Sequence, residues 1–135
     1  EELTLHNIDL TGLILKPNMI LAGASSNKKL SSEDVAKLTL KCLKENVPPE
    51  VPGIAFLSGG QSEIEAAENL NFINKYNESN FIMTYSYGRA LQQSALKFWS
   101  KDINNIQDTQ KIFNHRANMC TLAAQGKWSA ELETK

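Results

Sequence analysis

Residues 51–73, VPGIAFLSGGQSEIEAAENLNFI, decide the fold of this 135-residue chain, because they contain a strand, a turn and a helix in succession. The apolar run Val51–Leu57 has the length of a buried strand, and the glycines that follow it end the strand. Ser62 and Glu65 have the spacing of a capping box, which predicts the first turn of a helix. The segment therefore predicts one βα unit of a parallel sheet.

Two similar units flank this segment. The earlier one begins with the apolar run Leu10–Lys16 and continues into a helix that we expect to start at Ser31. The later one begins with Phe81–Tyr85 and continues into a helix that we expect to start at Arg89. Three successive βα units predict an α/β fold with a parallel sheet.

A final helix is predicted over residues 106–125, where apolar residues recur at helical spacing and Gly126 is suited to end the helix. The chain is expected to form part of one domain, residues 1–135, with residues 129–135 as a mobile polar tail. The pattern alone allows either a small doubly wound sheet or part of a (β/α)8 barrel. A closed barrel needs eight such units and about 250 residues.

Composition argues against several classes of function. The net charge is −1, and the basic residues are scattered, so a nucleic-acid or acidic membrane surface is not an expected partner. No apolar run is long enough to span a membrane, and no spacing typical of a metal site is present. Cys42 and Cys120 lie far apart, which favours reduced thiols and a cytoplasmic location. The first residue is Glu rather than Met, which is consistent with chain missing upstream.

Lys16 closes the apolar run of the first unit, where a fully solvated ammonium group is unusual. Partial desolvation would lower the pKa of the amine and prepare it for attack on a carbonyl group. The alternative is a lysine whose amine extends from the strand end into water or pairs with a carboxylate. The sequence pattern alone leaves both interpretations open.

The two glycine turns are candidate anion sites. Ser58-Gly59-Gly60 lies between a strand and a helix, where backbone N–H groups and the helix dipole favour a negative charge. Gly88-Arg89 adds a second turn and a guanidinium group that can bind phosphate through two hydrogen bonds. Each turn could also be purely structural, but the pair favours a phosphate site.

The remaining ionisable residues are assigned no chemical role. His6 and His115 occur in contexts that indicate surface or packing positions. Glu63, Glu65 and Glu68 are expected to form the solvated, dipole-favoured start of a helix rather than an acid/base pair.

Five segments of the chain together resemble one known family, the class I fructose-bisphosphate aldolases, in the family's order and with nearly its spacing. The resemblance covers about residues 10–128. The segments are LKPNM (15–19), VPP (47–49), FLSGGQSE (56–63), YSYGRALQ (85–92) and AQGK (124–127).

The resemblance implies a fold and a reaction. The chain would be the last three βα units and the C-terminal helices of a (β/α)8 TIM barrel, incomplete as given. The family cleaves fructose 1,6-bisphosphate reversibly into dihydroxyacetone phosphate and glyceraldehyde 3-phosphate, without a metal or other cofactor. A different lysine-imine barrel is disfavoured by the complete set of segments.

The resemblance also implies residue roles. Lys16 corresponds to the lysine that forms an imine with the ketose carbonyl, and Ser86 to a serine that contacts the substrate beside it. The residues that correspond to the phosphate site on the dihydroxyacetone side are Ser58, Gly59, Gly88 and Arg89.

Two departures from the family limit these expectations. The upstream strands, with the groups that transfer protons, precede Glu1, and the chain stops at 131–135 without the family's C-terminal tyrosine. We therefore expect the isolated chain to be inactive and to need the remainder of the barrel or another copy of itself. The alternative is a non-catalytic phosphate-binding or protein-interaction fragment. The family also implies a homotetramer and cytoskeletal partners.

Overall fold

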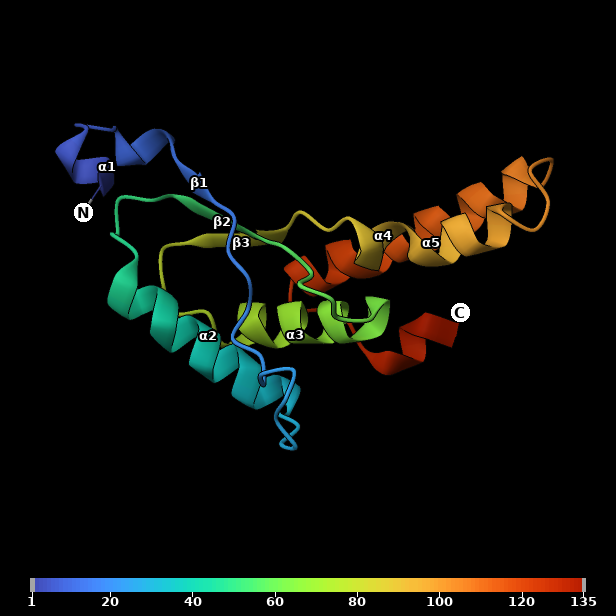
Figure 1. The fold of residues 1–135 in the computed structure, drawn as a ribbon, viewed down its shortest axis with the longest axis horizontal. Coiled ribbons are helices and arrows are strands. Elements are labelled where there is room, and N and C mark those ends of the chain that lie inside the picture. Colours follow the sequence, from blue (N-terminus) through green and yellow to red (C-terminus); the bar gives the residue numbers. More distant parts are fainter. Residues whose placement is uncertain (1, 135) are drawn as a thin grey trace.

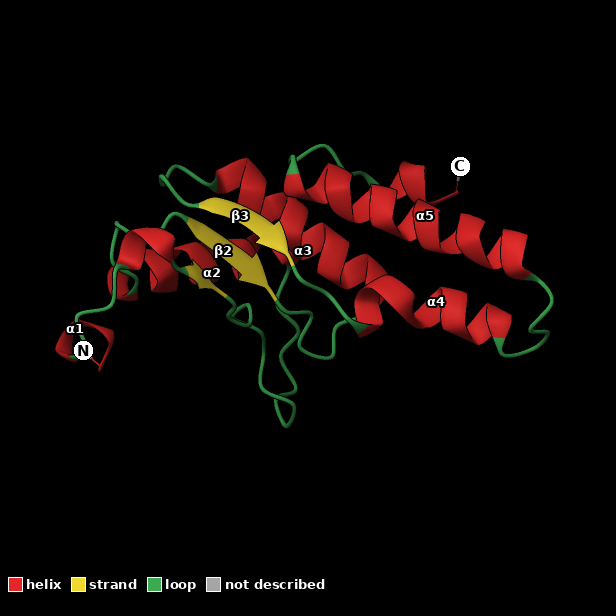
Figure 2. Cartoon of the chain, turned by 90° about the horizontal axis from the view of Figure 1, so that it is seen from above, coloured by secondary structure: helices red, strands yellow, loops and turns green. Residues whose placement is uncertain are grey.

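The computed structural model describes residues 2–134, which form a three-stranded parallel sheet in the order β1-β2-β3 with helices packed on one of its faces (Figure 1). The sheet lies above α2 and α3 in Figure 1, and Figure 2 shows the strands from the opposite, uncovered side. The elements in chain order are α1 (Glu2–Leu5), the 3₁₀-helix η1 (Leu10–Gly12), β1 (Ile14–Leu15), α2 (Ser32–Asn46), β2 (Gly53–Phe56), α3 (Glu63–Tyr76), β3 (Ile82–Tyr85), α4 (Arg89–Trp99), α5 (Ile106–Ala124) and the 3₁₀-helix η2 (Ala130–Thr134).

The strand register is regular across the sheet. Ile14 pairs with Gly53 and Leu15 with Ile54 between β1 and β2, and the pairing of β2 with β3 continues to Phe56 and Tyr85. Both crossover helices, α2 and α3, lie on the same face, whereas a doubly wound sheet has helices on both faces. This arrangement is consistent with part of a (β/α)8 barrel and confirms the predicted fold class.

The two faces of the sheet differ strongly in burial. Ile54 and Phe56 point toward the helices and are completely buried in the core. Ile14 and Ile82, on the opposite face, are 67% and 74% exposed. Because side chains alternate along a strand, this second face is apolar and uncovered in the chain as described.

Local sequence signals account for three of the helix boundaries. Ser62 and Glu65 form the predicted capping box, in which each side chain accepts a hydrogen bond from the other residue's backbone N–H group. The Ser31 hydroxyl accepts from the N–H of Asp34 at the start of α2. Gly126 has a positive φ of 67°, which suits the residue that follows a helix.

The first predicted strand is shorter than expected. The sequence predicted a strand over Leu10–Lys16, but Leu10–Gly12 form η1, and β1 contains only Ile14–Leu15. The carboxylate of Asp9 accepts hydrogen bonds from the backbone N–H and the hydroxyl of Thr11, and these bonds stabilise the turn instead of an extended strand.

The polar tail of the chain contains a short helix in the structure. Residues 130–134 form η2, which is attached to α5 through Glu133, whereas Lys135 and Glu1 lie outside the described residues. The buried guanidinium of Arg116 donates two hydrogen bonds to the Glu133 carboxylate, at 2.8 and 2.6 Å, and the Trp128 indole donates a third at 2.7 Å. Burial favours a higher pKa for Glu133, but these donors outweigh it and hold the pKa below its ordinary value of 4.5.

Two further properties concern the cysteines and the length of the apolar helices. Cys42 is exposed and Cys120 is buried, and both are unpaired. Within residues 2–134, no helix is both long enough and apolar enough to cross a membrane.

Candidate functional site

The candidate residues converge at the carboxyl edge of the sheet. The N–H of Leu57 donates to the carbonyl of Pro17 at 3.0 Å, and the N–H of Ser86 donates to the carbonyl of Phe56 at 2.8 Å. These bonds extend the parallel ladder beyond the three strands and keep their ends side by side. Lys16 therefore lies one strand away from the turn that begins at Ser58, and that turn lies one strand away from Ser86.

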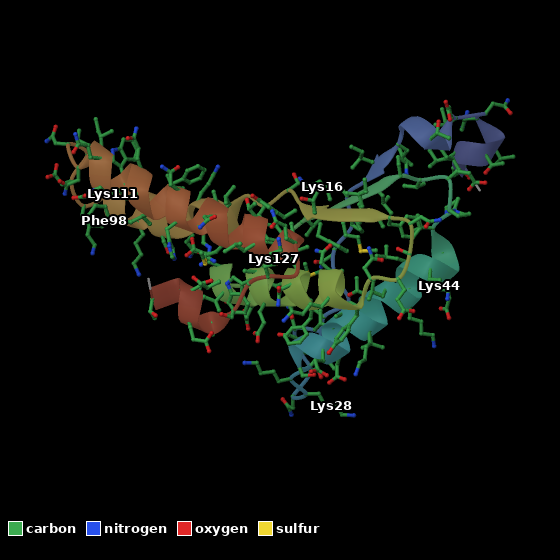
Figure 3. The ribbon with its side chains drawn as sticks, turned by 180° about the vertical axis from the view of Figure 1, so that it is seen from behind. Lys16, Lys28, Lys44, Phe98, Lys111 and Lys127 are labelled. Carbon is green, nitrogen blue, oxygen red and sulfur yellow. The ribbon has the colours of Figure 1, made fainter. Side chains whose placement is uncertain are left out.

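Lys16 belongs to the uncovered face of the sheet. It is two residues after Ile14, so the alternation of the strand gives both side chains the same orientation. Figure 3 shows Lys16 beside the strands, well separated from Lys28, Lys44 and Lys111 on the surrounding loops and helices. Lys16 is exposed in the described chain, which agrees with the interpretation of an amine that extends from the strand end into water. Lys16 is exposed because no element among residues 2–134 covers this face of the sheet.

The turn after β2 has the backbone geometry expected of an anion-binding loop. Gly59 and Gly60 both have positive φ, 54° and 85°, and the N–H of Gln61 donates to the carbonyl of Ser58 at 2.9 Å. The Ser58 side chain is 8% exposed, whereas the two glycines are exposed. The first turn of α3 follows at once, so its dipole favours a negative charge near this loop.

The turn after β3 is the second half of the candidate phosphate site. Gly88 is the N-cap of α4, and its carbonyl accepts the N–H groups of Leu91 and Gln92 at 3.1 and 3.2 Å. Arg89, the first residue of α4, is exposed, and its guanidinium has no hydrogen bond to another described residue. Arg89 is therefore available to bind an anion from solution.

Ser86 and Tyr87 point in opposite directions. Ser86 is exposed, in the alternation of the uncovered face, whereas Tyr87 is buried and its hydroxyl donates to the carbonyl of Ala66 in α3 at 2.9 Å. Burial raises the pKa of the Tyr87 hydroxyl far above its ordinary value, so this group stays protonated and remains a donor. Tyr87 thereby holds the β3–α4 turn against α3.

Sequence reasoning missed two residues that organise this edge. Tyr87 was not singled out, although a tyrosine at a strand end, between Ser86 and Gly88, is a suitable buried anchor. Glu63 was expected to be solvated, but its carboxylate accepts hydrogen bonds from Ser94 of α4. No local signal could have shown this second contact, because the two residues are 31 positions apart.

Lys28 and Lys29 line a pocket that the Ser58–Gly60 turn also lines. This pocket of about 410 Å³ is lined by the 26–30 loop, which includes Lys28 and Lys29, and by Gly59 and Gly60. Figure 3 shows Lys28 at the far end of this loop, away from the strands. These lysines are therefore the natural comparison for any chemistry assigned to Lys16.

The candidate site contains no arrangement of side chains suited to a metal. Among the described residues 2–134, no group of three or more His, Cys, Asp and Glu side chains is placed to hold an ion. What this edge offers a ligand is an amine, a serine hydroxyl, backbone N–H groups and a guanidinium. These groups suit a carbonyl compound that carries an anion.

Comparison with known proteins adds an independent finding. The family model "Glycolytic: Fructose-bisphosphate aldolase class-I" matches residues 1–135. A fructose-bisphosphate aldolase of Dictyostelium discoideum is 42% identical over 129 residues, which are 96% of this chain and 36% of the relative. Fructose-bisphosphate aldolase C of Rattus norvegicus is 48% identical over 124 residues, 91% of this chain and 34% of the relative.

A solved structure also resembles the chain. It is the fructose-bisphosphate aldolase of Plasmodium falciparum in a ternary complex with TRAP and a small-molecule inhibitor. The TM-score is 0.87 at 43% identity, covering 91% of this chain and 35% of that one. The chain thus spans about a third of the length of the proteins that it matches.

Proposed function

Because the chain belongs to the class-I fructose-bisphosphate aldolase family, we propose that it is part of an enzyme that cleaves fructose 1,6-bisphosphate through a lysine imine. The products are dihydroxyacetone phosphate and glyceraldehyde 3-phosphate, and the reverse reaction is aldol addition. The chain alone lacks this activity, because about two thirds of the length of its relatives lies outside the match.

One observation carries the proposal: an amine and two glycine turns share one edge of the sheet. Lys16 follows β1, the Ser58–Gly60 turn follows β2, and Gly88-Arg89 follow Ser86 at the end of β3. In parallel α/β folds this carboxyl edge is where ligands bind. A ketose phosphate would span it, with its carbonyl at Lys16 and its phosphate at the turns.

The chemistry follows from the residue types. The neutral amine of Lys16 adds to the ketose carbonyl, and the resulting carbinolamine takes up one proton and loses water to give a protonated imine. The imine accepts the electron pair released when the adjacent C–C bond breaks, which stabilises the carbanion. The backbone N–H groups of Gly59 and Gly88, the Ser58 hydroxyl and the Arg89 guanidinium fix the phosphate, so the carbonyl stays within reach of the amine. Ser86 contacts the substrate beside the imine.

The remaining barrel supplies what this chain does not. Its strands cover the apolar face around Ile14 and Ile82, exclude water around Lys16 and contribute the groups that transfer protons. The family resemblance implies a homotetramer of barrels, and the unpaired Cys42 and Cys120 are in keeping with a cytoplasmic location. Protein partners are in keeping with the complex of the Plasmodium falciparum relative with TRAP.

The experiment is reductive trapping in the full-length protein that contains this chain. Borohydride with dihydroxyacetone phosphate converts an imine into a stable secondary amine, and peptide mapping locates it. The proposal expects the adduct on Lys16, and Lys16→Arg abolishes it while the matched variant Lys28→Arg does not. An adduct on Lys28 or Lys29 would refute the role of Lys16, and no adduct at all would leave a phosphate-binding protein without imine chemistry.

A further inference from the structure

The two helices that follow the candidate phosphate turns are joined by one carboxylate. Glu63 is the first residue of α3, and its Oε1 accepts a hydrogen bond from the backbone N–H of Ser94 in α4 at 2.9 Å. Its Oε2 accepts a second hydrogen bond from the Ser94 hydroxyl. A carboxylate held by two donors of the same residue has little freedom to rotate.

The position of this contact matters because each helix begins at one of the two turns. α3 starts directly after residues 58–62, and α4 starts directly after its N-cap Gly88. Any shift of α4 relative to α3 therefore changes the separation of Gly59 from Gly88. A phosphate that binds both turns requires that separation to be constant.

A second hydrogen bond also attaches the turn after β3 to α3. The Tyr87 hydroxyl donates to the carbonyl of Ala66 at 2.9 Å, which fixes the end of β3 to the first turns of α3. Ser94 lies further along α4, so the Glu63 contact restrains α4 at a point beyond the turn that Tyr87 attaches. It acts together with the packing of α4 along α5.

We propose that Glu63 is a positioning residue that sets the distance between the two phosphate-binding turns through its hydrogen bonds to Ser94. The inference rests on the proposed function, since it assigns both turns to one phosphate group. Glu63 does not touch the substrate. The role requires hydrogen bonds and not a charge. A glutamine at the same position should therefore replace Glu63, since it could accept from the Ser94 N–H and donate to the Ser94 hydroxyl.

The test compares Glu63→Ala, Glu63→Gln and Ser94→Ala in the full-length protein that contains this chain. Glu68→Ala is the matched control, because Glu68 lies on the same helix without a side-chain hydrogen bond to another described residue. Borohydride inactivation is measured against the concentration of dihydroxyacetone phosphate and, separately, of dihydroxyacetone. The two ketones differ only in the phosphate, so a loss of folded protein alone would affect both equally.

The expected result is specific for the phosphate. Glu63→Ala raises the half-saturating concentration of dihydroxyacetone phosphate about tenfold and leaves that of dihydroxyacetone within about twofold. Glu63→Gln remains close to the wild type, Ser94→Ala lies between the two, and Glu68→Ala has no effect. Equal changes for both ketones, no change in Glu63→Ala, or a Glu63→Gln variant as impaired as Glu63→Ala would each overturn the proposal.

A calorimetric titration with inorganic phosphate separates this proposal from the proposed function. Phosphate binding that weakens in Glu63→Ala but not in Glu63→Gln supports the positioning role even if no imine is trapped, in which case only the proposed reaction fails. A trapped imine with phosphate affinity that is independent of Glu63 overturns the positioning role alone. Absence of phosphate binding to the wild type overturns the positioning role and the phosphate site, whereas the imine reaction is decided by trapping on Lys16. Circular dichroism of each variant shows whether the fold is retained, and Ser94→Ala provides the test if Glu63→Ala does not fold.

Discussion

The side-chain amide of Asn18 lies directly against the α-carbon of Gly59. A Cβ built on Gly59 would be 2.8 Å from the Cγ of Asn18, closer than real Cβ atoms approach other heavy atoms. Asn18 is itself held by a hydrogen bond from the Met19 N–H to its Oδ1, at 2.9 Å. The loop that follows Lys16 and the turn that begins at Ser58 therefore fit together only with glycine at position 59.

We predict that Gly59→Ala destabilises the full-length protein by about 2–4 kcal/mol, from the positive φ and the contact with Asn18 together. Gly60→Ala is the control, because its φ is also positive but nothing lies within 4 Å of its Cβ. We expect it to cost only about 1–2 kcal/mol. Urea unfolding measures both, and equal losses would mean that Asn18 moves aside without cost.

We predict that Arg89→Ala weakens the binding of phosphorylated ketones by about 1.5–3 kcal/mol, the contribution of one hydrogen bond to a charged group. Arg89 is exposed and has no other hydrogen bond among the described residues, so the substitution should leave stability unchanged. Saturation curves with dihydroxyacetone phosphate and dihydroxyacetone measure the effect, with Lys97→Ala on the same helix as control. A similar loss for both ketones would show that Arg89 supports the fold instead of the phosphate.

We predict a pH-dependent contribution of Glu133 to stability. The folded pKa of Glu133 lies below its ordinary value of 4.5, so the unfolded chain binds the proton more tightly. The stabilisation is therefore complete above pH 4.5 and is lost as the pH falls from there through the folded pKa. At about pH 7, Glu133→Gln should lower the free energy of unfolding by roughly 1–3 kcal/mol.

The measurement is urea unfolding of the wild type and Glu133→Gln at a series of pH values. The difference between them should be constant near neutrality and should shrink below pH 4.5, the ordinary value for this carboxyl. Glu131→Gln is the control, because Glu131 is exposed on the same 3₁₀-helix. A difference that grows on acidification would contradict the assigned role of the Arg116–Glu133 pair.

We predict that the purified chain of residues 1–135 does not cleave fructose 1,6-bisphosphate. Its uncovered sheet face exposes Ile14 and Ile82, and positioned proton-transfer groups, which contribute about 10²–10⁴-fold in rate, are expected on the missing strands. Addition of a separately expressed upstream segment should restore some activity if the two parts associate. Full turnover by the monomeric chain, with its mass measured by light scattering, would refute the prediction.

The sequence correctly predicted those features of the structure that depend on residues close together in the chain. The capping box of Ser62 and Glu65, the glycine after α5 and the start of α4 at Arg89 all follow from contacts within one helical turn. The parallel order of the three strands followed from the repeated βα pattern, since such connections put successive strands side by side. The positions of the two glycine turns at one sheet edge were predictable for the same reason.

Other features were decided only by the tertiary structure, because they depend on residues that are distant in the chain. The 3₁₀-helix at 130–134 is bonded to Arg116 of α5, and Glu63 accepts hydrogen bonds from Ser94, 31 positions away. Lys16 is exposed although the residues before it in the sequence are apolar, because burial depends on which elements cover a face of the sheet. The sequence by itself thus determined the order of the elements and the chemical groups at their ends, and only the three-dimensional packing determined which of those groups are held together, covered or left accessible.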